Sequence, residues 1–300
     1  MSVPHTAQPA RRRRHGGIAS RLLTVITSGT MHQSFLGNPA VAMMIRAAPQ
    51  RHRRALALEL LAISPHYFTE QASERYAPDM RRREVLEREL ERNIVSRRKL
   101  FDDVIAPYLA PKMTALDLGC GAGILAHEMA KRCRAVIAVD ISRGALAAGE
   151  ALFPLPNLSF RFVRRGRIEG VADGSVDLVT AIAVIQHMTD PEFDGALAEI
   201  ARVLVPGGRA LCHVPLEETA AATPNATRHV DRRNPVERLL QRQYGLLMLY
   251  RDRDAVERLA ARHGLSVESA AVIGSMSAIE DDIAHQQLFV LRRRLAQEAP

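Results

Sequence analysis

The sequence of 300 residues lacks several features that would each indicate a particular class of protein. Tryptophan is absent, aromatic residues make up only 4% of the chain, and no apolar run approaches the roughly 20 residues that cross a bilayer as a helix. No short apolar core with a small-residue cleavage site follows the basic N-terminus, so we expect no secretory signal. A hydrophobic content of 47% is nevertheless enough for one large folded domain with an extension.

Cysteine is also scarce. The three cysteines, Cys120, Cys133 and Cys212, are odd in number, lie far apart and form no C-x-x-C pair. This spacing supports neither a disulfide framework nor a zinc site. We therefore expect reduced thiols in a cytoplasmic protein, and no bound metal.

Acidic residues are missing from the first 58 positions, which carry nine arginines. The remaining 242 residues hold 32 basic and 33 acidic side chains, so the net charge of +8 belongs to a basic leader and not to the folded body. Lysine occurs only three times against 38 arginines, a skew typical of a GC-rich, bacterial genome. The arginine count is therefore weak evidence for phosphate binding, and nucleic acid is not the expected partner.

Composition divides the chain into three predicted segments. Residues 1–17 are rich in proline, glycine, histidine and arginine and predict a disordered basic tail. Residues 18–80 contain short apolar stretches broken by prolines and predict a helical extension. Residues 81–300 carry the periodic patterns of one domain, in which the polar stretch 216–250 is interpreted as an insertion on the acceptor side.

Apolar strands alternate with helical patterns in residues 81–300. The predicted strands are Thr114–Leu118, Ala135–Val139, Leu158–Val163, Val176–Ala183, Arg209–Val214, Ser266–Ile273 and Gln286–Leu291. The predicted helices are 81–109 with a break, Gly123–Cys133, Ser142–Leu152 with Ser142 as N-cap, one that begins at the N-cap Asp190 followed by Pro191, and Asp252–His263, which ends at Gly264. Continuous apolar strands between helices predict an α/β fold, with a seven-stranded, mostly parallel, doubly wound Rossmann-like sheet.

The residues that carry chemistry begin with a glycine-rich turn, Asp117-Leu-Gly119-Cys-Gly121-Ala-Gly123, between a strand and a helix. Glycines let the backbone turn tightly and approach a ligand. Asp140 ends the next strand, where a carboxylate can accept hydrogen bonds from both hydroxyls of a ribose. Ligands of open parallel sheets bind at the carboxyl ends of the strands. The two features together predict a nucleoside cofactor.

Two classes of nucleoside cofactor are compatible with this turn. Gly121-x-Gly123-x-x-Ala126 satisfies the dinucleotide pattern G-x-G-x-x-G/A. Asp117 opposes that interpretation, because a carboxylate beside a pyrophosphate is unfavourable, whereas it would attract a cationic ammonium or sulfonium group. The glycine pattern alone does not decide between them.

Five motifs in order resemble the class I S-adenosylmethionine-dependent methyltransferases, over residues 81 to about 215. They are Ala115-Leu-Asp-Leu-Gly-Cys-Gly-Ala-Gly123, Ala138-Val-Asp140, Asp173-Gly-Ser-Val-Asp-Leu-Val179, Val184-Ile-Gln-His-Met188 and Arg202-Val-Leu-Val-Pro-Gly-Gly208. The resemblance implies S-adenosylmethionine as cofactor. It implies that Gly119, Gly121 and Gly123 pass under the methionine portion, that Asp117 faces the ammonium group, that Asp140 takes the ribose hydroxyls with Ile141 on the adenine, and that Ala181 offers its backbone carbonyl.

One position departs from the family pattern. Many members carry Gly-Asp after the third strand, with the aspartate on the adenine amino group, and this chain has Gly166-Arg167. Arginine cannot accept that hydrogen bond. We expect the adenine to be read by backbone atoms near Arg167 and Ile168, or by Glu169.

Methyl transfer needs a general base only when the acceptor is weakly acidic. His187, in the segment that borders the methyl group in this family, is the candidate base, and His213 is a weaker second. The N-P-P-Y and Pro-Cys signatures of base-modifying enzymes are missing, so we expect a small-molecule acceptor, such as a hydroxyl or carboxyl of a lipid or natural product. The alternatives are a non-catalytic, methyltransferase-like binding protein and an RNA methyltransferase that uses the basic leader.

Overall fold

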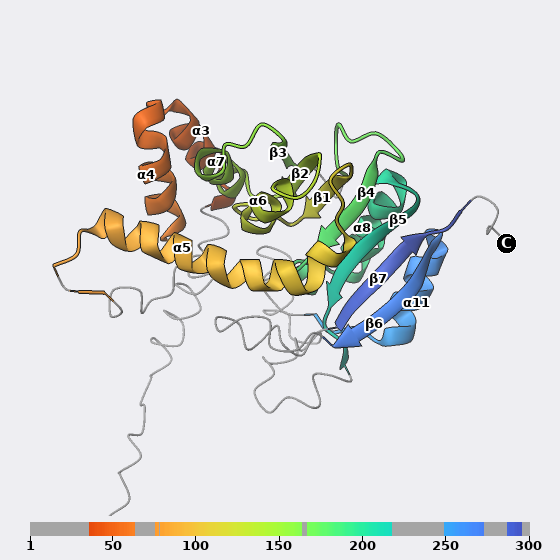
Figure 1. Cartoon of the computed structure of the whole chain (residues 1–300). Coiled ribbons are helices and arrows are strands. Elements are labelled where there is room, and N and C mark those ends of the chain that lie inside the picture. Colours follow the sequence, from red (N-terminus) through yellow and green to blue (C-terminus); the bar gives the residue numbers. More distant parts are fainter. Residues whose placement is uncertain are drawn as a thin grey trace, which may run out of the picture.

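A computed structural model describes residues 36–63, 76–77, 79–163, 167–217, 249–272 and 287–295 (Figure 1). The predicted tail 1–17, the first part of the extension and most of the insertion 216–250 lie outside these residues. Among the helices described, none combines the length and the apolar character needed to cross a bilayer.

Seven strands form one sheet in the order β3-β2-β1-β4-β5-β7-β6. The strands are β1 Thr114–Leu118, β2 Ala135–Asp140, β3 Leu158–Phe162, β4 Val176–Ala181, β5 Leu204–Val214, β6 Leu265–Val272 and β7 Gln287–Arg293. The first five pair in parallel, while β7 runs antiparallel to both β5 and β6. The predicted α/β class and mostly parallel sheet are confirmed. The winding reverses between β1 and β4, which places a ligand-binding edge there.

Helices cover both faces of the sheet. Neighbouring residues of a strand point to opposite sides, so each strand contributes side chains to the core on both faces. Leu116 of β1 faces a core shared with α8 (Asp190–Val203) and α11 (Arg253–Arg262), whereas Ala115 faces α6 (Ile124–Ala130). The predicted break in the long helix is confirmed: α5 (Arg82–Leu100) passes into a π turn at Phe101–Ile105 and a 3-10 turn at Ala106–Tyr108.

Helix caps follow the predictions with one correction. Ser142 caps α7 (Arg143–Leu152), as expected, and Gly264 has the positive φ of +73° that a C′ glycine needs. Asp252, predicted as the first residue of its helix, is the N-cap of α11. The predicted cap Asp190 is wrong by one residue, because Asp190 is the first residue of α8 and Thr189 is its N-cap. Glu192 accepts the N–H of Thr189 at 2.7 Å, and the Thr189 side chain accepts the backbone N–H of Glu192. This reciprocal pair, a capping box, satisfies two N–H groups at the helix end, where Asp190 alone would satisfy one.

The N-terminal helices α3 (Pro39–Ala47) and α4 (Gln50–Leu61) pack against α7 at the end of the sheet opposite to β6 and α11 (Figure 1). Their apolar side chains form one core with those of α5 and α7. Gly144 makes the close approach possible: a Cβ at this position would lie 2.4 Å from the carbonyl oxygen of Leu36 and 2.9 Å from Val41.

We expect Gly144→Ala to lower the free energy of unfolding by about 1–3 kcal/mol, because backbone atoms of Leu36 would have to move. Gly195→Ala, at a helical glycine of α8 with nothing within 4 Å of the added methyl group, is the matched control. It should be neutral or stabilising by up to about 1 kcal/mol, from the better helix propensity of alanine. Urea denaturation measures both variants, and equal stabilities would contradict the packing described here.

Candidate functional site

The carboxyl ends of β1, β2 and β4 meet at the point where the winding reverses. The turn after β1 has three glycines with positive φ: +74° at Gly119, +55° at Gly121 and +80° at Gly123. Two of them also touch neighbouring elements, because a Cβ at Gly119 would lie 2.3 Å from Val184 and one at Gly123 would lie 2.5 Å from the Phe160 ring. Conformation therefore favours glycine at all three positions, and space excludes a side chain at Gly119 and Gly123 as well.

Four backbone N–H groups of this turn donate hydrogen bonds to acceptors within the protein. Gly119 and Cys120 donate to the carbonyl of Val139 at 2.8 and 3.1 Å, and Gly123 donates to Cys120 at 2.8 Å. Gly121 donates to the Asp140 carboxylate at 2.8 Å. A pyrophosphate site needs such groups for its own oxygens, so this hydrogen bonding disfavours the dinucleotide interpretation.

Asp140, at the end of β2, is held in one orientation. Its Oδ2 accepts the N–H of Gly121 at 2.8 Å, and its Oδ1 accepts the N–H of Ser142 at 2.7 Å. Burial raises the pKa of Asp140, and these two N–H groups oppose the shift. An ionised carboxylate has about four acceptor positions, so two are left for hydroxyl groups of a ligand. Ile141 follows it with 72% of its surface exposed, an apolar side chain open to a flat ligand.

Asp117 lies deeper, with 3% of its surface exposed. Its Oδ1 accepts the hydroxyl of Thr180 at 2.8 Å. Burial raises the pKa of Asp117, the Thr180 hydroxyl lowers it and the charge of Asp140 raises it, with a net value of about 7. The site thus contains two neighbouring carboxylates, one rigid and partly exposed and one buried and close to its neutral form near pH 7.

The turn after β4 approaches the glycine turn through the contact between Val184 and Gly119. Ala183 precedes it with a φ of +56°, the one non-glycine residue with positive φ among those described. Ala181 ends β4 with a fully buried side chain, and His187 lies partly buried in the 3-10 turn Ile185–His187. His213, the second candidate, is fully buried in β5.

Sequence reasoning missed the residues that fix this turn. Leu249 donates its N–H to the carbonyl of Gln186 at 2.8 Å, and the buried Arg251 donates to the carbonyl of Ile185 at 3.2 Å. The Arg251 guanidinium also lies over the Phe193 ring, 4.6 Å from its centroid. No spacing pattern marks Leu249 or Arg251, because Leu249 stands near the end of the polar stretch 216–250 and Arg251 directly after it, outside the motifs.

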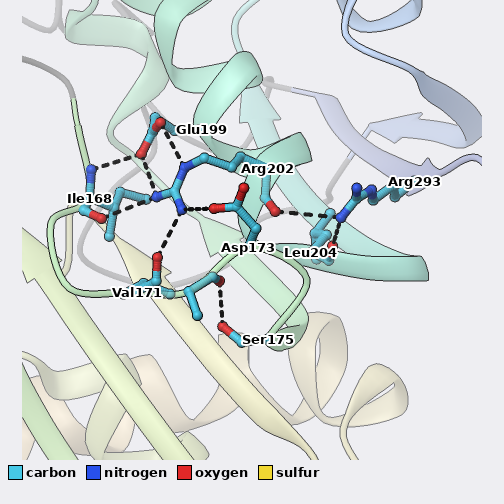
Figure 2. A network of polar contacts seen from close by, with 9 residues as sticks. Ile168, Val171, Asp173, Ser175, Glu199, Arg202, Leu204 and Arg293 are labelled. Carbon is cyan, nitrogen blue, oxygen red and sulfur yellow. Dashed lines mark hydrogen bonds and ion pairs between the residues drawn. The ribbon is translucent and has the colours of Figure 1, made fainter.

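The two residues predicted at the adenine edge lie in different environments. Arg167 is exposed, whereas Ile168 is 2% exposed in the core. The N–H of Ile168 donates to Glu199 at 2.9 Å and its carbonyl accepts from Arg202 at 3.1 Å, as Figure 2 shows. Both backbone groups of Ile168 are thus bonded within the protein, and the roles of Glu199 and Arg202 were not predicted.

Metal ligands do not gather at this edge. Within the described ranges, no group of three or more histidine, cysteine or acidic side chains could hold a metal ion.

Comparison with known proteins adds a family match. Residues 116–212 match the model of a methyltransferase domain. The chain is 34% identical over 100 residues to a ubiquinone biosynthesis O-methyltransferase of Hahella chejuensis, a match that covers 32% of this chain and 41% of that protein. A protein of the same name from Acinetobacter baumannii (strain AYE) is 34% identical over 97 residues. The chain therefore spans about two fifths of the length of these curated relatives.

Solved structures share the fold. A protein of Pyrococcus horikoshii OT3 matches with a TM-score of 0.52 and 17% identity, over 79% of this chain and 99% of that one. The phosphoethanolamine N-methyltransferase 1 of Haemonchus contortus, solved with phosphoethanolamine and S-adenosylhomocysteine, matches with a TM-score of 0.51 and 15% identity, over 68% of this chain and 43% of that one. At these identities the likeness concerns the fold alone.

The raised pKa of Asp117 predicts how stability depends on pH. Its folded pKa of about 7 lies above the unfolded value near 3.9, so the folded chain binds more protons between these values and its stability falls as pH rises through this range. We expect Asp117→Asn to remove this loss and to stabilise the ligand-free protein at pH 8 by up to about 4 kcal/mol, with little effect at pH 4.

Thermal or urea denaturation from pH 4 to 8 measures the effect. Asp254→Asn, at an exposed position in the first turn of α11, is the control and should keep the slope of the unmodified chain. A parallel pH dependence of Asp117→Asn and the unmodified chain would show that Asp117 does not hold a proton in the fold.

Proposed function

We propose that this chain, which carries a class I S-adenosylmethionine-dependent methyltransferase domain, transfers the methyl group of that cofactor to an oxygen atom of a small-molecule acceptor. One observation supports the cofactor part most directly: the turn after β1 donates its Gly121 N–H to the Asp140 carboxylate. A turn built this way suits a cofactor with ribose hydroxyls and a positive charge better than one with phosphates.

The residues present fit S-adenosylmethionine. Asp140 has two acceptor positions for the ribose hydroxyls, and the exposed Ile141 gives the adenine an apolar contact. Asp117 would face the ammonium group, whose charge favours the ionised form of a carboxyl with a pKa of about 7. The bound cofactor supplies an electrophilic methyl group, and the protein contributes alignment and a dry cavity.

The acceptor is proposed to be a hydroxyl or carboxyl of a lipid or natural product. The relatives named as O-methyltransferases support an oxygen acceptor, although the match covers a third of this chain. His187 would remove the proton of a hydroxyl acceptor, and its turn is fixed by Leu249 and Arg251. A carboxyl acceptor is already ionised at neutral pH and needs no base.

We expect the purified chain to bind S-adenosylhomocysteine, and Asp140→Ala to weaken this binding by about 100-fold or more, since two hydrogen bonds to a charged group are lost. Asp177→Asn is the matched control: Asp177 also accepts a backbone N–H, that of Thr114 at 2.8 Å, but near the first residue of β1, at the opposite edge of the sheet. Isothermal titration measures the affinity of both variants for S-adenosylhomocysteine. Tight binding of NAD in place of S-adenosylhomocysteine would overturn the proposal.

For acceptors with a hydroxyl group, we expect His187→Ala to lower kcat/KM by about 100-fold or more, the size of general-base catalysis, and to leave the affinity for S-adenosylhomocysteine unchanged. Release of S-adenosylhomocysteine from S-adenosylmethionine over a panel of phenols, alcohols and carboxylic acids measures the rates. Equal rates of the two proteins on a hydroxyl acceptor would exclude His187 as base. Cofactor binding without turnover on any acceptor would favour the non-catalytic alternative.

A further inference from the structure

Arg202 is the next-to-last residue of α8 and the first residue of the motif Arg202–Gly208. Its side chain connects α8 to the chain between β3 and β4 (Figure 2). Its guanidinium donates to five oxygens: Glu199 Oε1 at 3.0 Å, Glu199 Oε2 at 2.8 Å, the Val171 carbonyl at 2.8 Å, Asp173 Oδ1 at 2.6 Å and the Ile168 carbonyl at 3.1 Å. Only 20% of the side chain is exposed. A planar group with a fixed fork of donors holds several partners in one geometry, which a lysine cannot do.

Glu199 completes a clamp on a single residue. While it pairs with Arg202, its Oε2 accepts the N–H of Ile168 at 2.9 Å. The ion pair therefore holds the N–H of Ile168 through Glu199 and its carbonyl through Arg202. With its side chain buried as well, Ile168 is fixed on three sides, and the adjacent Arg167 and Glu169 remain exposed.

The clamped residue belongs to the same apolar core as Val139, the residue before Asp140. Val163, just after β3, donates its N–H to the backbone carbonyl of Asp140 at 3.0 Å. Only four residues separate Val163 from Ile168. A base joined to a ribose at Asp140 would lie beside the exposed Ile141, and the chain that leaves β3 is bonded to Asp140 at Val163. The pair at Arg202 therefore sets one end of a short segment whose other end is tied to Asp140.

We propose that Arg202 and Glu199 are positioning residues for adenine recognition: by clamping Ile168 they hold residues 167–169 where backbone or side-chain oxygens accept the adenine amino group. This inference rests on the proposed function. It explains how the chain reads adenine although Arg167 stands where an acceptor would be expected, because the acceptor is placed by α8 and not by the residue type in the loop.

The test compares S-adenosylhomocysteine with S-inosylhomocysteine, in which a carbonyl oxygen replaces the adenine amino group. We expect the unmodified chain to prefer the first by about tenfold, the size of one hydrogen bond, and Arg202→Met and Glu199→Gln to reduce this preference to about twofold or less. Arg202→Lys should rescue little, since it keeps the charge but loses the fork. Isothermal titration gives the affinities, and thermal denaturation shows which variants are folded.

Arg209→Met is the matched control, because Arg209 makes a similar two-pronged pair with Glu268, at 2.7 and 3.2 Å, between β5 and β6. It should keep the full preference. If the variants lose affinity for both ligands equally, the pair only stabilises the fold and the inference fails. If the unmodified chain has no preference, the inference fails too. If it binds neither ligand, the proposed function fails first, in the unmodified chain. Should Arg202→Met not fold, Glu199→Gln decides, because it keeps the size of the side chain and removes the ion pair with Arg202 on which the clamp depends.

Discussion

The hydrogen bonds from Gly121 and Ser142 to the Asp140 carboxylate are the interaction on which the rest of the site depends. They join the turn after β1, the end of β2 and the start of α7 through one side chain. The positive φ of Gly121 lets its N–H point at that carboxylate, and the cap at Ser142 turns the chain away from it. With the amides of the turn engaged inside the protein, the edge of the sheet presents carboxylates to a ligand, and this sets the class of cofactor.

This arrangement has an energetic cost that the fold carries in the absence of ligand. Asp117 and Asp140 are close enough for the charge of one to raise the pKa of the other, and burial disfavours ionisation of both. A buried carboxyl that served only stability would be paired with a cation or replaced by an apolar side chain. Asp117 accepts the hydroxyl of Thr180, and in the proposed function a cationic ligand would match its negative charge.

Contacts between elements that are distant in the sequence support the site from two sides. On the β3 side, Arg202 and Glu199 of α8 hold Ile168, and the N-terminal helices pack on α7 through Gly144. On the β4 side, Arg251 fixes the turn that carries His187. The contacts of Arg202, Glu199 and Arg251 join a side chain to backbone atoms of a loop, so these loops are set by neighbouring elements as much as by their own sequence.

The sequence by itself determined what depends on local patterns. Continuous apolar runs predicted six strands to within two residues, since burial on both faces demands such residues, whereas β5 begins at Leu204, five residues before the predicted Arg209. The glycines of 119–123 marked the turn, because only glycine adopts those φ values without strain. Asp140 was singled out by its position at the end of a strand, whereas the roles predicted for Asp117 and Ile141 came from the resemblance of the motifs. The cap of α8 was misplaced by one residue, because Asp190 and Thr189 are both good caps and only the reciprocal bond to Glu192 separates them.

The tertiary structure decided what depends on contacts between distant residues. Arg202 meets the Ile168 carbonyl across 34 positions, and Arg251 meets that of Ile185 across 66. A hydrogen bond from a side chain to a backbone carbonyl requires nothing of the residue type that supplies the carbonyl, so it leaves no pattern in the sequence. The pKa of Asp117 likewise follows from its burial beside Asp140, which exists only once β1 and β2 are paired. Only the folded chain brings such groups together.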